Sequence, residues 1–280
     1  MLGKLIKHEF KATARIFLFV YIALIVISAI NMIVVPWEFV GDTSTGIVAT
    51  GSVLSNFLKG ITGFMYMIVV AATAVVTLIV NISRYYKNLM GDEGYLMFTL
   101  PVSKESLVIS KLIVGFVWNI CSFVLICLSL LMLFGRYDLF GGLRSSLAMA
   151  EFMGINIGVW ITMIIVILLT TTIANLLMLY AAISIGPNVI KNRLGGSIIA
   201  YIIIYVIVQI VATAMIAILG VIINGNTTLF NVELSTLSDI QGLNFAFYLI
   251  VGVGIVMNVI VIAACYIITR RMLNKKLNLA

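Results

Sequence analysis

The chain has 280 residues, of which 63% are hydrophobic and 10% are charged, and its formal net charge is +7. A soluble domain carries about 25% charged and about 45–50% apolar residues, so this composition excludes a water-soluble protein. Nucleic-acid binding needs basic residues gathered on one soluble face. Here the lysines and arginines are scattered among segments that flank apolar runs, so we expect membrane lipid around the chain and no nucleic-acid partner.

The first 15 residues, MLGKLIKHEFKATAR, have an amphipathic pattern. At 100° per residue, an apolar face runs from Leu2 through Phe10 and Thr13 and continues to Phe17. The opposite face carries four bases: Lys4, Lys7, Lys11 and Arg15. The pattern predicts an N-terminal amphipathic helix, residues 1–15, lying in the membrane interface with its basic side toward anionic headgroups.

Glu9 interrupts the apolar face of this helix. A carboxylate that faces lipid or protein needs a partner or becomes protonated. Our hypothesis is that Glu9 faces the protein and pairs with Arg84, at the end of the second span. The alternative is that Glu9 reaches the headgroups instead.

Six long apolar runs predict six transmembrane helices, because about 20 apolar residues cross the hydrocarbon layer as a helix. The expected spans are at about 16–36, 61–82, 107–134, 157–185, 197–223 and 245–269. The predicted fold class is therefore an all-α integral membrane protein, in which residues 16–280 form one six-span domain after the N-terminal helix.

The basic residues predict the orientation of these spans. Six spans place both termini on one side, and that side holds 14 of the 17 lysines and arginines. The positive-inside rule makes it cytoplasmic in a plasma-membrane protein. Tyr85 and Tyr86 are expected at the inner interface. Outer segments at about 37–60, 135–156 and 224–244 each have room for a short surface helix.

The loop between the second and third spans, residues 91–102, has the features of a short isolated helix. Gly91 favours a helix end, Asp92 is a capping residue with Glu93 in the first turn, and Pro101 stops the helix. Its apolar side chains need a surface to bury against, because so short a helix is unstable alone. We expect it to dock into a groove of a cytoplasmic partner; the alternative is that it folds back onto the membrane or its own bundle.

The predicted spans contain no clear Asp, Glu, Lys or Arg, which weighs against a proton-driven transporter. Polar side chains do occur within them. Packing between helices is the default interpretation of such residues, and a polar path for cargo is the alternative. The candidate cargo path consists of Asn119, Thr170, Thr171, Asn175 and Gln209.

Signatures of catalysis are missing from the sequence. It has no H-E-x-x-H, no G-x-S-x-G and no G-x-x-x-x-G-K-[ST] phosphate-binding loop. We therefore expect no catalytic residue, no metal site and no cofactor in this chain, which is not predicted to be an enzyme. If transport is driven by ATP, the ATPase is a separate polypeptide.

The loop also resembles one protein family, the permeases of ABC-2-type ABC transporters. The shared pattern reads Glu93-Gly94, YLMFTL, Pro101-Val102-Ser103 and then Lys111-Leu112, with Leu100 where the family often has alanine. The opening LIKHEFKATAR is similar to the family's N-terminal connecting helix.

The resemblance implies a bacterial exporter built from several chains. A dimer of cytoplasmic ABC ATPase subunits would hold ATP and Mg, and this chain would pair with a second copy or a homologous permease. The cargo would be hydrophobic or amphipathic, such as a peptide, a bacteriocin or a drug. The ATPase-coupling residues would be Asp92, Glu93, Gly94, Tyr95, Leu96, Met97, Phe98, Thr99, Leu100 and Pro101.

Two other functions fit the same features. The chain is alternatively a non-transporting membrane scaffold or sensor that recruits a cytoplasmic partner through the same loop. It is alternatively a facilitative carrier or channel that needs no ATP.

Overall fold

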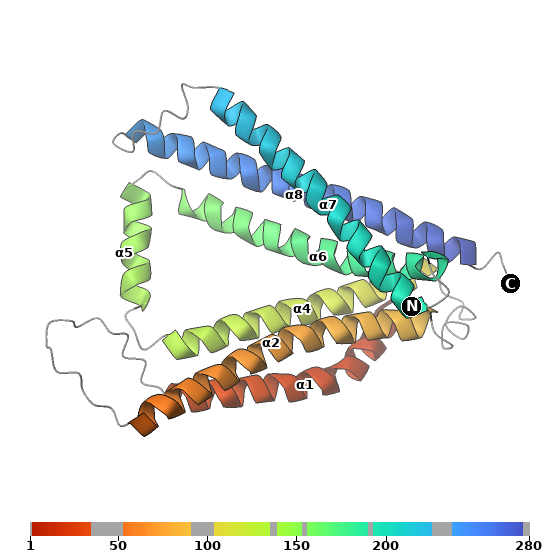
Figure 1. Cartoon of the computed structure of the whole chain (residues 1–280), viewed down its shortest axis with the longest axis horizontal. Coiled ribbons are helices and arrows are strands. Elements are labelled where there is room, and N and C mark those ends of the chain that lie inside the picture. Colours follow the sequence, from red (N-terminus) through yellow and green to blue (C-terminus); the bar gives the residue numbers. More distant parts are fainter. Residues whose placement is uncertain are drawn as a thin grey trace, which may run out of the picture. The chain divides into compact units, whose positions relative to one another are not determined.

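A computed structural model describes most of the chain. The described residues are 2–34, 53–90, 104–134, 139–152, 156–189, 193–225 and 237–276. Within these ranges every residue except Asn156 is α-helical, so the predicted all-α class is confirmed. The helices are α1 (Leu2–Val34), α2 (Val53–Met90), α4 (Lys104–Phe134), α5 (Leu139–Phe152), α6 (Ile157–Val189), α7 (Arg193–Gly225) and α8 (Leu237–Lys276) (Figure 1).

Among the described residues, six helices are long and apolar enough to cross a membrane. These are α1, α2, α4, α6, α7 and α8. The last five each contain one predicted span, and α1 contains residues 16–34 of the first predicted span. Their outward side chains are large and apolar: Phe19 is 68% exposed, Met67 68% and Ile210 63%. Such a surface is stable only in lipid, so the chain is a multi-pass membrane protein. The cytoplasmic placement of its two termini stays a prediction.

The helices extend beyond the predicted spans. α1 is continuous across the expected boundary at residue 15, and α8 begins at Leu237, inside the expected outer segment. α6 runs past residue 185, the end of its predicted span, and includes Pro187. Hydropathy marks only the part of a helix that needs lipid, whereas backbone hydrogen bonding continues past the hydrocarbon. A proline is tolerated where neighbouring groups satisfy the freed backbone carbonyl.

One compact unit comprises Met1–Asn81 and Ile113–Leu143. Within it α1, α2 and α4 lie side by side (Figure 1), and Trp118 of α4 is the centre of the core. Its ring stacks on Phe10 and Phe17 of α1, at centroid distances of 4.7 and 4.4 Å. Its indole Nε1 donates a hydrogen bond to Thr13 Oγ1 over 2.9 Å. The apolar face predicted for the N-terminal helix therefore packs on protein, and its interfacial placement stays a prediction.

Hydroxyl groups also join the helices of this unit. The Tyr21 hydroxyl lies 2.8 Å from Ser122 Oγ, which lies 3.0 Å from Thr77 Oγ1. Tyr66 and Ser129 form another pair, with their oxygens 2.8 Å apart. Interhelical hydrogen bonds of this kind supplement van der Waals packing in membrane proteins, where helix association gains little from the hydrophobic effect.

The other compact unit comprises Ile82–Leu112 and Arg144–Ala280. It contains the last turns of α2, the first turns of α4, and α6, α7 and α8. α6 packs extensively against both α7 and α8, which contact each other little (Figure 1). Near the start of α6, Trp160 stacks on Phe247 of α8 with the ring centroids 3.7 Å apart. The C-terminal half of α6 supplies most of the buried side chains of that helix.

Candidate functional site

The predicted coupling residues, Asp92 to Pro101, lie in segment 91–103, outside the described residues. Their role stays a prediction. The structure does describe the two helix ends that flank this segment, because α2 ends at Met90 and α4 begins at Lys104. Both ends belong to the same compact unit as α6 and α8. The contacts of these two ends define the candidate site.

The end of α2 is fixed to α6 by a tyrosine pair. Tyr85 is fully buried, and its ring is stacked on Tyr180 with centroids 4.1 Å apart and an interplanar angle of 8°. The Tyr85 hydroxyl lies 2.9 Å from Ser184 Oγ. Because Ser184 donates its own proton to the Tyr180 carbonyl oxygen over 2.8 Å, Tyr85 is the donor in that pair. Ring stacking and a buried hydrogen bond thus hold the same side chain.

The start of α4 is fixed to the same residue of α6. The Tyr180 hydroxyl donates a hydrogen bond to the Lys111 carbonyl oxygen over 3.3 Å. Leu107, Val108 and Ser110 of α4 are buried. Tyr180, itself 1% exposed, therefore contacts both helix ends that flank segment 91–103.

An ion pair connects the first turn of α4 with α8. Arg270 Nη2 lies 2.6 Å from Glu105 Oε1, and the two side chains are 58% and 45% exposed. Glu105 also lies at the helix N-terminus, where a negative charge is favourable. Because the pair is well solvated, we expect it to orient α4 more than to stabilise it.

α6 and α7 approach each other closely at Gly186, two residues after Ser184. A Cβ atom added to Gly196 of α7 would overlap the carbonyl oxygen of Gly186 on α6, and one added to Gly186 would overlap Ser197. The two backbones are therefore in direct contact, with no side chain between them. Only glycine permits this separation.

Glu9 and Arg84, the predicted ion pair, belong to different compact units. Glu9 is 6% exposed, so its carboxylate does not lie on an open helix surface. The four bases of the same helix, in contrast, are exposed. Pairing of Glu9 with Arg84 stays a prediction.

The candidate cargo-path residues are only partly brought together. Asn258 of α8 donates hydrogen bonds from Nδ2 to Oγ1 of Thr171 and Thr170, over 2.8 and 3.5 Å. Asn175 and Gln209 are exposed. Asn119 donates to the Gly115 carbonyl oxygen of its own helix over 2.8 Å. Thr170, Thr171 and Asn258 therefore form one polar contact between helices, and a continuous cargo path stays a prediction.

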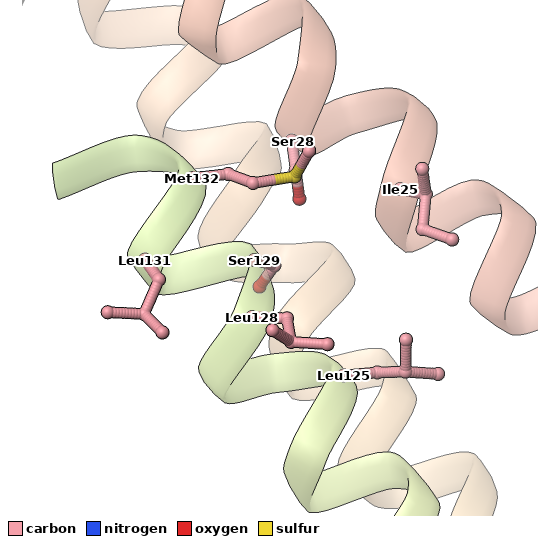
Figure 2. A pocket seen from close by; sticks show the side chains of 7 residues that line it. All are labelled: Ile25, Ser28, Leu125, Leu128, Ser129, Leu131 and Met132. Atoms are coloured by element: carbon pink, nitrogen blue, oxygen red, sulfur yellow. The ribbon is translucent and has the colours of Figure 1, made fainter. Parts of the chain in front are cut away.

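An apolar groove lies between α1 and α4 in the unit that contains Trp118. Figure 2 shows its lining, and its volume is about 420 Å³. The lining side chains are Ile25, Ser28, Leu125, Leu128, Ser129, Leu131 and Met132. Ser28 donates to the Leu24 carbonyl oxygen over 2.6 Å, and Ser129 to that of Ile126 over 2.8 Å. Both serine protons are used within the helices, so the groove presents mainly apolar surface.

Sequence reasoning missed the tyrosine pair. Tyr85 was expected at the membrane interface, but it is fully buried against protein. A signal was present in α2, where buried residues recur at four-residue spacing: Thr73, Thr77, Asn81, Tyr85 and Leu89. Small polar residues at helical spacing indicate a helix–helix contact in a membrane protein. No such spacing of small polar residues indicated the buried contacts of Tyr180 or Ser184.

Across the described ranges, no group of three His, Cys, Asp or Glu side chains gathers in a way that could hold a metal ion. Comparison of the chain with protein-family models, curated proteins and solved structures gives no match. The class of protein is therefore defined by the fold: a multi-pass, all-α membrane protein. Its described site is a buried junction of helices α2, α4 and α6, with an exposed ion pair to α8.

Proposed function

We propose that this chain is the permease subunit of an ATP-driven ABC exporter in the plasma membrane, with both termini cytoplasmic. It moves a hydrophobic or amphipathic cargo, such as a peptide, a bacteriocin or a drug. ATP and Mg are bound by a separate dimer of cytoplasmic ATPase subunits, and the chain pairs with a second copy or a homologous permease. The chain itself carries out no chemistry.

The observation that carries this proposal is that the two helix ends flanking segment 91–103 both contact the same residue of α6. Tyr85 at the end of α2 and Lys111 near the start of α4 both contact Tyr180. A loop that merely connects two spans needs no such attachment. A loop that receives a mechanical push does need it, because a force applied to a loosely held segment would be lost in local motion. The sequence pattern from Glu93 to Leu112, similar to that of ABC-2-type permeases, gives the same interpretation.

In this proposal, ATP-driven closure of the ATPase dimer moves the coupling residues as a rigid body. The movement reaches α6 through Tyr180 and α8 through the Glu105–Arg270 ion pair. The permease converts this push into a switch between two access states of the cargo path.

The apolar surfaces support a hydrophobic or amphipathic cargo. The groove between α1 and α4 presents isoleucine, leucine and methionine side chains. The hydrogen bonds of Asn258 on α8 with Thr170 and Thr171 on α6 involve uncharged groups only. Such groups can accept a weakly polar molecule but cannot neutralise a highly charged one.

Co-purification with an ABC ATPase tests the proposal. Leu96→Asp combined with Phe98→Asp places two charges in the predicted docking surface, so we expect the ATPase to be lost from the purified complex. Leu147→Asp is the control, because Leu147 lies on α5, is 44% exposed and is predicted to be outside the cell. Retention of the ATPase by the double variant would show that the coupling assignment is wrong.

A further inference from the structure

We propose that residues 180–186 of α6 form a transmission element that passes movement of segment 91–103 on to α7. The inference rests on the proposed function and deepens it, because it assigns the residues that connect the ATPase-facing side to a membrane helix. Tyr180 receives the movement, and the backbone contact between Gly186 and Gly196 passes it on.

The first step depends on how the two helix ends that flank segment 91–103 meet α6. Tyr85 stacks on the Tyr180 ring and donates to Ser184, whereas Lys111 accepts from the Tyr180 hydroxyl. All three contacts fall within two helical turns, and Tyr85, Tyr180 and Ser184 are each no more than 1% exposed. Because close-packed interiors transmit strain, α2 and α4 cannot shift together without moving this part of α6.

The second step depends on the contact two residues further along. The Gly186 carbonyl oxygen lies directly against Gly196, and Gly186 itself lies against Ser197. A contact between two backbones has no rotatable side chain that can absorb a displacement. A shift of α6 at Ser184 therefore displaces the start of α7.

α7 is suited to respond to such a displacement. No residue of its most apolar 18-residue stretch is buried. Gly196 and Ala200, near its start, are buried against the rest of the unit. The buried residues that the structure describes in α7 therefore lie near the end where it meets Gly186.

A fluorescent label on α7 tests the inference in the complete permease–ATPase complex in lipid nanodiscs. Ile207→Cys, at a position 56% exposed, carries a bimane label in a background where Cys121, Cys127 and Cys265 are replaced by alanine. The probes are Mg-ATP and Mg-ATP with vanadate. We expect the label's emission to change when ATP is trapped.

Tyr180→Phe keeps the ring stack but removes the hydrogen bond to Lys111, and Tyr85→Phe removes the one to Ser184. Each variant should shift the equilibrium between the two α7 states by roughly 2- to 30-fold toward the resting state. ATPase binding should be unchanged, because neither residue lies in segment 91–103. Tyr86→Phe, the same substitution at the neighbouring position, should behave like the parent chain.

The outcomes separate the two proposals. If the parent chain binds no ATPase, the proposed function is wrong. The assignment of the transmission element is wrong, and the proposed function stands, in either of two cases. In the first, the ATPase binds but α7 of the parent chain does not respond to trapped ATP. In the second, α7 responds in Tyr180→Phe and in Tyr85→Phe as strongly as in the parent chain. A shift of the α7 equilibrium toward the resting state, with unchanged ATPase binding, supports the inference. If Tyr85→Phe does not fold, Ser184→Ala replaces it in the test, because it removes the partner of the same hydrogen bond.

Discussion

The rings of Tyr85 and Tyr180 are stacked nearly parallel, with their centroids 4.1 Å apart, although 94 residues separate them in the chain. The pair is buried, and each hydroxyl group has a hydrogen-bond partner. It fixes the last turns of α2 to the part of α6 that also holds the start of α4. The two helix ends that flank the predicted coupling segment are therefore held by a small number of side chains that can be changed one at a time.

Tyr85→Phe should lower the free energy of unfolding by about 0.5–1.5 kcal/mol, because it removes one buried hydrogen bond and keeps the ring. The measurement is unfolding of the detergent-solubilised chain by sodium dodecyl sulfate. Tyr205→Phe is the control, since Tyr205 is 51% exposed and the change should stay within about 0.5 kcal/mol. Equal stability of the two variants would contradict the role given to the Tyr85 hydroxyl.

Gly196→Ala should destabilise the chain by about 1–3 kcal/mol, because its methyl group has no room beside the Gly186 carbonyl oxygen. Gly220→Ala is a matched control on the same helix, because a Cβ added there meets nothing within 4 Å. Thermal unfolding of both variants gives the comparison. If Gly196→Ala is as stable as Gly220→Ala, the two backbones are not in contact as described.

Hydropathy predicted the number of spans well because the length of an apolar run follows directly from bilayer thickness. It did not predict where the helices end. The predicted span 157–185 ends before Gly186 and Pro187, yet both residues lie within α6. The glycine is needed for the close approach to Gly196, so a residue type that usually ends helices here permits helix packing. Sequence alone does not distinguish these two uses of glycine.

Thr13→Val should cost about 1–3 kcal/mol of stability, because it leaves the buried indole N–H of Trp118 without an acceptor. Thr213→Val changes the same group on an exposed face of α7, where the hydroxyl bonds only to the Gln209 carbonyl oxygen of its own helix. Urea unfolding in mild detergent measures both. A loss as small in Thr13→Val as in Thr213→Val would show that the hydrogen bond to Trp118 contributes little.

Glu9→Gln and Arg84→Gln should show a coupling energy of about 0.5–3 kcal/mol in a double-mutant cycle if the two side chains pair. The burial of Glu9 motivates the experiment, because a carboxylate that is 6% exposed needs a compensating group. Unfolding of the two single variants and the double variant supplies the cycle. Additive losses would favour another partner for Glu9.

The amphipathic pattern of residues 1–15 predicted one apolar face and one basic face on the N-terminal helix. Phe10, Thr13 and Phe17 face Trp118, and the four bases are exposed. The pattern could not indicate that this face packs on α4, because an apolar stripe is equally suited to lipid and to protein. Tyr85 illustrates the same limit, since a tyrosine near a span end fits both an interface and a buried contact.

ATP hydrolysis by the ABC ATPase, measured with and without this chain in lipid nanodiscs, tests the central claim most directly. We expect hydrolysis to depend on the native chain and to be lost with the Leu96→Asp, Phe98→Asp double variant. The Leu147→Asp control should retain full hydrolysis. Hydrolysis that is the same with the native chain, with the double variant and without any permease would show that this chain is not the permease of that ATPase.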